Sequence, residues 1–217
     1  MKLQEKHAKI LDREWDTEKL FTHLVRFARA GHDPNWWRSY TTYEAAATHL
    51  KTYAALVIPG LLQTPDYARA LLVAGQVVED VEASVAARMA RQEILNRPKP
   101  VQLWALVKQS VLEDPVGGPE VMRAQLAHLL EMSRCPNIFL RVVPRSVGAH
   151  VGLDGSFSLM IGPNGSVAYM EAVGGGRLSL DPAEVARFTV RFDQIGADAL
   201  SRDATRTLIE QLLEAKA

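Results

Sequence analysis

The stretch from Val57 to Ala70 constrains the fold most, because it joins two amphipathic patterns and yet is apolar in its middle. Pro59-Gly60 predicts a turn, since proline fixes φ and glycine tolerates positive φ. Thr64-Pro65-Asp66 matches a helix start, with the threonine as N-cap, the proline at the first helical position and the aspartate in the first turn. Leu61-Leu62 is apolar where an exposed linker would be polar. We therefore expect an ordered crossing inside the fold.

Hydrophobic periodicity predicts helices first and strands later. Before residue 100, two helices are expected in residues 1–30, one after the Trp36–Tyr40 stretch and running through Tyr53, and two more at 67–74 and 81–96. Strands are expected at 101–107, 137–144, 157–161 and 167–173, with a short fifth at 177–180 and helices at 121–132, 181–195 and 201–213. The helix at 121–132 makes the first two strands parallel neighbours. The expected fold class is α+β, with N-terminal helices followed by a mostly antiparallel sheet of four or five strands and packed helices.

Composition narrows the function classes. The chain has 25 Lys+Arg and 25 Asp+Glu, and this zero net charge argues against direct nucleic-acid binding, which usually needs a basic excess. The single cysteine, Cys135, has no internal disulfide partner, which suits the cytoplasm. No stretch approaches the roughly 20 apolar residues of a membrane span, and residues 1–9 lack a signal-peptide pattern. We expect a cytoplasmic protein that does not contact membranes.

The sequence contains no convincing enzyme motif. It lacks Gly-x-Ser-x-Gly, His-Glu-x-x-His, a phosphate-binding loop and paired cysteines. We therefore expect no cofactor and no bound metal. Whether the chain is an enzyme stays open at this point.

The later half carries the best polar constellation. His150 lies in a glycine-flanked loop, Gln109 ends the first strand, and Tyr169 and Glu171 point to one face of their strand. If the first, third and fourth strands are neighbours, these groups converge to hold a polar ligand or to do acid–base chemistry. The slightly favoured alternative is that Glu171 and His150 satisfy buried backbone groups or each other.

Two other groups of residues have a functional and a structural interpretation. Arg88 and Gln92 share a helix face with Arg91 nearby, and an arginine there can grip a carboxylate or a phosphate. A solvated face or a structural ion pair is the more common outcome. Trp36-Trp37 can line a pocket by stacking, although ordinary core packing is favoured.

The ordered set of motifs resembles one known family. Pro59 to Ala70 resembles a signature of the C-terminal domain of actinomycete antitoxin-like helix-turn-helix (XRE-type) transcriptional regulators. The resemblance covers roughly Trp36 to Leu213 and continues through Arg88-x-x-Arg91-Gln92, Pro115-Val116-Gly117-Gly118, Gln125-Leu126-x-x-Leu129-Leu130, Gly148-Ala149-His150, Gly155-Ser156-Phe157 and Tyr169-Met170-Glu171. The family's DNA-binding helix-turn-helix would precede this region, and we do not find it here.

The resemblance implies a regulatory domain that binds an effector or a partner. Residues 1–35 would be the joint after a missing helix-turn-helix, and residues 36–217 the effector- or partner-binding α+β domain. The partner would be a small molecule or a small companion protein, and we expect a homodimer, since soluble oligomers are mostly two-fold. We predict a ligand pocket with polar residues and aromatic walls at Trp37, Gln63, Tyr67, Arg91, Trp104, Gln109, His150, Tyr169 and Glu171.

The sequence departs from its relatives at two positions. Lys108-Gln109 stands where the family typically has an acidic pair, and Glu113-Asp114 where it has basic residues. An alternative function is therefore a stand-alone enzyme of specialised metabolism built on the same domain. It would use His150 and Glu171 as the acid–base pair, with Tyr169 beside them.

Overall fold

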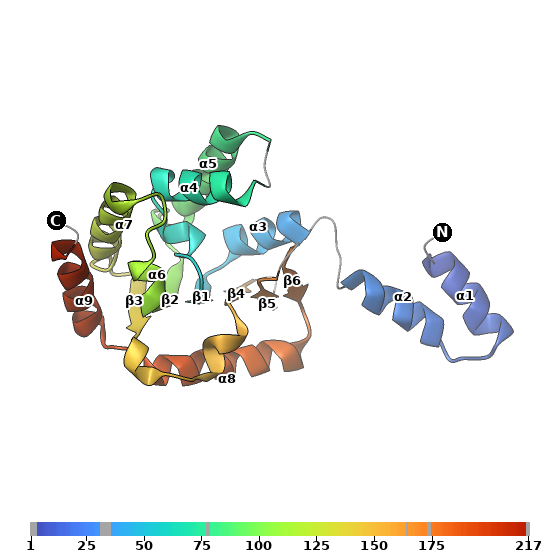
Figure 1. The fold of residues 1–217 in the computed structure, drawn as a ribbon. Coiled ribbons are helices and arrows are strands. Elements are labelled where there is room, and N and C mark those ends of the chain that lie inside the picture. The colour runs from blue at the N-terminus through green and yellow to red at the C-terminus, as the bar shows by residue number, and fades with distance from the viewer. Residues whose placement is uncertain (1–3, 31–35, 77–78, 164, 173–174, 216–217) are drawn as a thin grey trace.

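The computed structural model describes residues 4–30, 36–76, 79–163, 165–172 and 175–215. Over these residues the fold is α+β, as expected, with helices packed around a six-stranded mixed sheet that curls into a half-barrel (Figure 1). No helix in these ranges combines the length and the apolar character that a membrane crossing needs.

The sheet has a parallel half and an antiparallel half. Its strands are β1 (His49–Ala54), β2 (Gln102–Lys108), β3 (Ile138–Val143), β4 (Phe157–Gly162), β5 (Gly165–Met170) and β6 (Arg177–Ser179). Their order is β3-β2-β1-β4-β5-β6. Strand β1 is parallel to β2, which is parallel to β3, and the remaining neighbours are antiparallel. The central strand β1 therefore joins the two halves.

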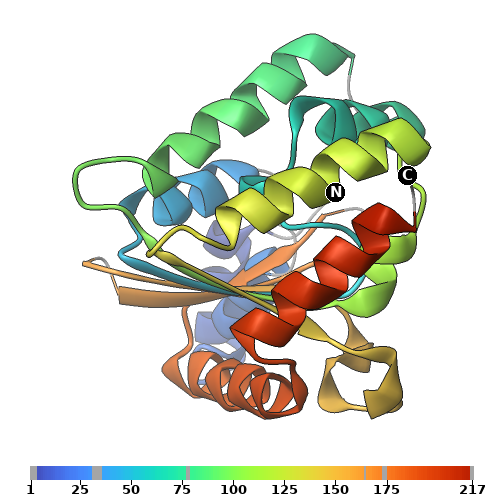
Figure 2. The same ribbon diagram turned by 90° about the vertical axis from the view of Figure 1, so that its left-hand side faces the viewer.

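Helices cover both sides of the sheet. The α-helices are α1 (Glu5–Glu14), α2 (Leu20–Ala30), α3 (Trp36–Ala46), α4 (Pro65–Gly75), α5 (Val81–Ala90), α6 (Gln109–Glu113), α7 (Pro119–Met132), α8 (Pro182–Asp198) and α9 (Arg202–Glu214). Short 3₁₀ turns are η1 (Gly60–Leu62), η2 (Arg91–Leu95), η3 (Arg145–Val147) and η4 (Val151–Asp154). Figure 2 shows α4, α5 and α7 above the sheet and α8 below it. We call these sides the pocket face and the α8 face.

Side chains alternate between the two faces along each strand, and each face has its own hydrophobic cluster. On β1, Leu50 and Ala54 pack with Leu62 on the pocket face. Tyr53 points the other way and packs with Phe192 of α8. Because successive strand residues point to opposite faces, this assignment fixes where every other strand side chain lies.

Two element predictions need correction. The helix expected through Tyr53 ends at Ala46, and residues 49–54 form β1, which raises the strand count to six. The six-residue segment fits either period, and pairing with β2 and β4 decides it by burying Leu50 and Ala54. The single helix expected at 81–96 is α5 followed by the tighter turn η2.

Most other elements are confirmed. Thr64 caps α4 by accepting a hydrogen bond from the Tyr67 backbone N–H at 3.3 Å, and Leu61-Leu62 is buried. The expected parallel pair is β2–β3. The predicted strand at 167–173 falls partly on residue 173, which lies outside the described residues.

Helices α1 and α2 form a hairpin that projects away from the sheet (Figure 1). Asp12 holds the hairpin by accepting hydrogen bonds from the backbone N–H groups of Phe21 at 2.7 Å and Thr22 at 2.9 Å. Burial alone would raise the pKa of Asp12, but these bonds and the hydroxyls of Thr22 and Thr17 lower it to about 2. The carboxylate therefore stays ionised and caps the start of α2.

Candidate functional site

The Val57–Gln63 crossing is fixed by side chains from other elements. The Ile58 N–H donates to the Tyr67 hydroxyl at 3.2 Å, and the Gln63 side-chain amide donates to the Ile58 carbonyl at 2.6 Å. From η2, the Gln92 amide donates to the carbonyls of Gly60 at 3.1 Å and Gln63 at 2.8 Å. A segment without a long helix or strand thus becomes a rigid floor.

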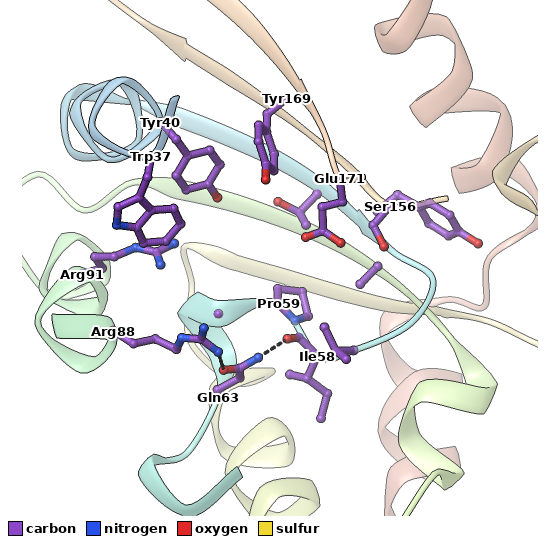
Figure 3. Close-up of a pocket in the computed structure, with 15 residues that line it drawn as sticks. Trp37, Tyr40, Ile58, Pro59, Gln63, Arg88, Arg91, Ser156, Tyr169 and Glu171 are labelled. Carbon is purple, nitrogen blue, oxygen red and sulfur yellow. Dashed lines mark hydrogen bonds between the residues drawn. The ribbon is translucent and has the colours of Figure 1, made fainter. Parts of the chain in front are cut away.

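A pocket of about 160 Å³ lies between this floor and the pocket face of the sheet (Figure 3). Its lining is Trp37, Tyr40, Thr52, Tyr53, Ala54, Val57, Ile58, Pro59, Gly60, Gln63, Arg88, Arg91, Ser156, Tyr169 and Glu171. The volume is smaller than the roughly 300–1,000 Å³ of a drug-sized site. The pocket therefore suits a small ligand.

One side of the pocket is a closed set of interactions that we call the paired cluster: Trp37, Tyr40, Glu44 and Arg91. The Arg91 guanidinium donates to both carboxylate oxygens of Glu44, at 2.6 and 2.8 Å. It also lies over the rings of Trp37 at 4.8 Å and Tyr40 at 5.4 Å. The Tyr40 hydroxyl donates to Glu44 at 3.0 Å, and burial together with Glu44 raises the pKa of Tyr40 well above its usual value. Every charge in this cluster has a partner.

The other side of the pocket differs, because it contains Arg88 and Glu171, which we call the open pair. The Arg88 guanidinium donates to the Gln63 side-chain oxygen at 2.8 Å. Within the described residues, no carboxylate lies within ion-pair distance of Arg88. Burial, helped by the nearby charge of Arg91, lowers the pKa of Arg88, although a guanidinium stays protonated at neutral pH. Arg88 is a half-buried cation, and further N–H donors of its guanidinium remain available for a ligand.

Glu171 approaches the pocket from the end of β5, across from Arg88 (Figure 3). Its backbone N–H donates to the Ser156 carbonyl at 3.2 Å, which fixes the chain where the strand ends. The carboxylate reaches solvent at the pocket rim, but neighbouring groups displace enough water to raise its pKa, while the Ser156 hydroxyl and Arg88 oppose that rise. Burial and Glu171 together raise the pKa of Tyr169 to about 12, so its hydroxyl keeps its proton.

Five residues that the sequence analysis selected lie together in this pocket: Trp37, Gln63, Arg91, Tyr169 and Glu171. Tyr169 of β5 and Glu171, which follows the last residue of that strand, both line the pocket. Arg91 was expected to be a polar ligand-binding group, but its guanidinium forms an ion pair with Glu44.

His150 does not join these residues. Its ring packs edge-on against Tyr53, with centroids 6.0 Å apart, and its Nδ1 accepts from the Gly152 N–H at 3.1 Å. Tyr53 points to the α8 face, whereas Tyr169 and Glu171 point to the pocket face. The first, third and fourth predicted strands are β2, β4 and β5, and β1 separates β2 from β4. Glu171 therefore lines the pocket without His150 beside it in the lining.

Three further residues lie elsewhere. Tyr67 is fully buried beneath the floor, which it supports through its hydroxyl. Trp104 is on the α8 face, stacked on Phe139 with centroids 4.8 Å apart. Gln109 donates to Glu113 at 2.7 Å and accepts from the Arg145 N–H at 3.0 Å, so it joins α6 to the loop after β3.

The site also contains residues that the sequence analysis did not select: Tyr40, Arg88 and Ser156. Arg88 was recognised as a possible anion-binding arginine, but nothing in the sequence distinguishes it from Arg91. The difference depends on Glu44, which lies on another helix. Ser156 enters the site through the pairing of β4 with β1 and β5, and no local motif marks it.

The fold and the pocket define an α+β domain that holds a small polar site between a curled sheet and a braced crossing segment. The chain belongs to the family described as a domain of unknown function, DUF5753, whose model matches residues 37–211. That range includes every residue of the pocket lining. Neither a curated protein nor a solved structure matches the chain.

Proposed function

We propose that this chain is the effector-binding domain of an actinomycete transcriptional regulator and that it binds a small molecule in the pocket. The motifs that resemble such regulators support the regulatory role. The pocket supports the small molecule, since polar groups converge on a small, largely preformed hollow with aromatic walls.

The observation that carries the proposal is the state of Arg88. A charged group held partly out of water loses hydration, and it is costly to keep without a partner. Gln63 satisfies one of its donors, and the guanidinium has five. A bound anionic group would supply the missing partner.

Native mass spectrometry of the purified protein tests the proposal. Under gentle conditions we expect a small extra mass on the folded chain, which leaves when the protein is denatured. Arg88→Met should lose the extra mass. The matched control Arg69→Met, which removes a surface arginine paired with Asp66 and Glu82 outside the pocket, should keep it. A bare wild-type chain that no added small molecule stabilises would contradict the proposal.

We also propose that two copies pair through the α1–α2 hairpin. Ile10, Trp15, Leu20 and Leu24 are each at least half exposed there, on a hairpin that projects away from the sheet. Leu20→Lys combined with Leu24→Lys should convert a dimer to a monomer in light scattering. An unchanged mass would show that the hairpin is not the interface.

The enzyme alternative has less support, because Glu171 lines the pocket whereas His150 is absent from its lining and packs against Tyr53. No other observation in the described residues favours catalysis. We therefore propose binding, with regulation as its consequence.

A further inference from the structure

The open pair places charges of opposite sign on two sides of one small pocket. Arg88 comes from α5 and Glu171 from the end of β5, and Figure 3 shows the two side chains across the hollow from each other. Each influences the pKa of the other through its charge, without a hydrogen bond between the two side chains. The space between them separates a fixed cation from a fixed anion.

The rest of the pocket contributes no net charge. The two neighbouring ions, Arg91 and Glu44, neutralise each other through two hydrogen bonds. With Arg88 and Glu171 added, the formal charge around the pocket is zero. A ligand with a net negative charge would gain from Arg88 and be repelled by Glu171, and a ligand with a net positive charge would meet the reverse.

We propose, on the basis of the proposed function, that the ligand is a small zwitterion of the α-amino-acid type. Its carboxylate pairs with the Arg88 guanidinium, and its ammonium group pairs with the Glu171 carboxylate. This arrangement satisfies both charges at once, and charge-assisted hydrogen bonds of this kind are the strong ones.

The uncharged lining fits the remainder of such a molecule. Ile58 and Pro59 provide an apolar surface at the floor, Ala54 of β1 provides one on the sheet side, and Tyr169 provides an aromatic wall. An amino-acid side chain can pack there while the charged end spans the open pair. Gln63 fixes the guanidinium by accepting one of its hydrogens at 2.8 Å and is itself held by the Ile58 carbonyl, so the carboxylate subsite is preorganised.

The test is a thermal-shift and calorimetry panel on the full chain. The probes are the common L-amino acids, their N-acetyl derivatives, their methyl esters, and inorganic phosphate. At least one free amino acid should raise Tm. Its N-acetyl derivative and its methyl ester should each bind at least about tenfold more weakly, since each lacks one of the two charged contacts.

Two variants each test one of the two charged contacts. Glu171→Gln should abolish the preference for the free amino acid over its N-acetyl derivative, and Arg88→Met should abolish the preference over the methyl ester. Arg88→Lys, which keeps the charge but loses the planar fork, should bind with intermediate affinity. Arg69→Met should match the wild type.

Three results would overturn the zwitterion. The N-acetyl derivative or phosphate could bind as tightly as the free amino acid, which would indicate an anion site. The methyl ester could bind as tightly, which would indicate a cation site. The third result is that none of the amino acids raises Tm and the purified protein carries a different small mass. In that case the effector-binding function stands and the ligand class is wrong. Failure of both measurements would remove the function as well.

Discussion

Arg88 and Arg91 lie close together in sequence, at the junction of α5 and η2, and line the same pocket, but they are in opposite electrostatic situations. Arg91 is locked between Glu44 and two aromatic rings. Arg88 has an amide as its partner and faces the hollow. The comparison shows that an arginine at a pocket can be scaffold or binding group, and that its partner decides which.

The paired cluster should therefore govern stability, and the open pair should govern binding. Breaking a buried ion pair strands one charge, whereas removing a cation that lacks a carboxylate partner strands none.

Glu44→Ala should give the largest loss of stability. Its side chain is 3% exposed in the ion pair, and its removal leaves Arg91 and the Tyr40 hydroxyl without an acceptor. We expect a loss of about 3–5 kcal/mol in the free energy of unfolding. Urea denaturation measures it, and a change below about 1 kcal/mol would show that the pair is not structural.

Gln63→Ala should affect both stability and binding. Gln63 is 2% exposed and bridges the Ile58 carbonyl to the Arg88 guanidinium. Leaving these groups unsatisfied should cost about 1–3 kcal/mol in unfolding free energy, and the loosened Arg88 should weaken ligand binding. Calorimetric titration alongside urea denaturation measures both, and a loss confined to one of them would contradict the bridging role.

Arg88→Met should change unfolding free energy by about 1 kcal/mol or less, since the Gln63 oxygen that loses its donor lines the pocket, where water can replace the guanidinium. Ligand affinity should nevertheless fall at least about tenfold. The decisive feature is the contrast with Glu44→Ala. If Arg88→Met unfolds as readily as Glu44→Ala, the distinction between the two regions fails.

Binding should weaken as pH falls, because the Glu171 carboxylate must be ionised to hold an ammonium group. Loss of water raises its pKa, so the loss of affinity should begin above the usual glutamate value of 4.5. The raised pKa also means that the folded state disfavours the ionised form, so Glu171→Gln should not destabilise the protein at neutral pH. Affinity measured between pH 4 and 8 should titrate in the wild type and stay flat in this variant.

Trp104→Ala should have the smallest effect on binding, less than about twofold. The tryptophan stacks on Phe139 and lies on the α8 face, with the sheet between it and the pocket. Titration of the same ligand checks this. A loss as large as that of Arg88→Met would move the site to the other face.

Local patterns in the sequence predicted much of the fold and part of the site. Thr64-Pro65-Asp66 carries its own helix signal, and the two-residue spacing of Tyr169 and Glu171 at the end of a strand places both near one site whatever the sheet order. The order itself could not be read, because β1 is short and depends on partners more than 50 residues away. Trp104 alternates with Leu103 and Ala105 of the pocket face, and the sequence alone did not show which face would hold the pocket.

The roles of the two arginines were beyond sequence reasoning for a related reason. Their difference depends on Glu44, on a helix before β1, and on Gln63, on the crossing segment. Neither residue can be identified from the local sequence of α5 and η2. Tertiary contacts therefore determine which cation remains available for a ligand.

The most direct test of the account is calorimetric titration of wild type and Arg88→Met with the ligand identified by mass spectrometry or by the amino-acid panel, accompanied by urea denaturation of both proteins. The account predicts nearly equal unfolding free energies and an affinity at least about tenfold lower for the variant. Equal affinities in the two proteins would contradict the claim that Arg88 binds the ligand.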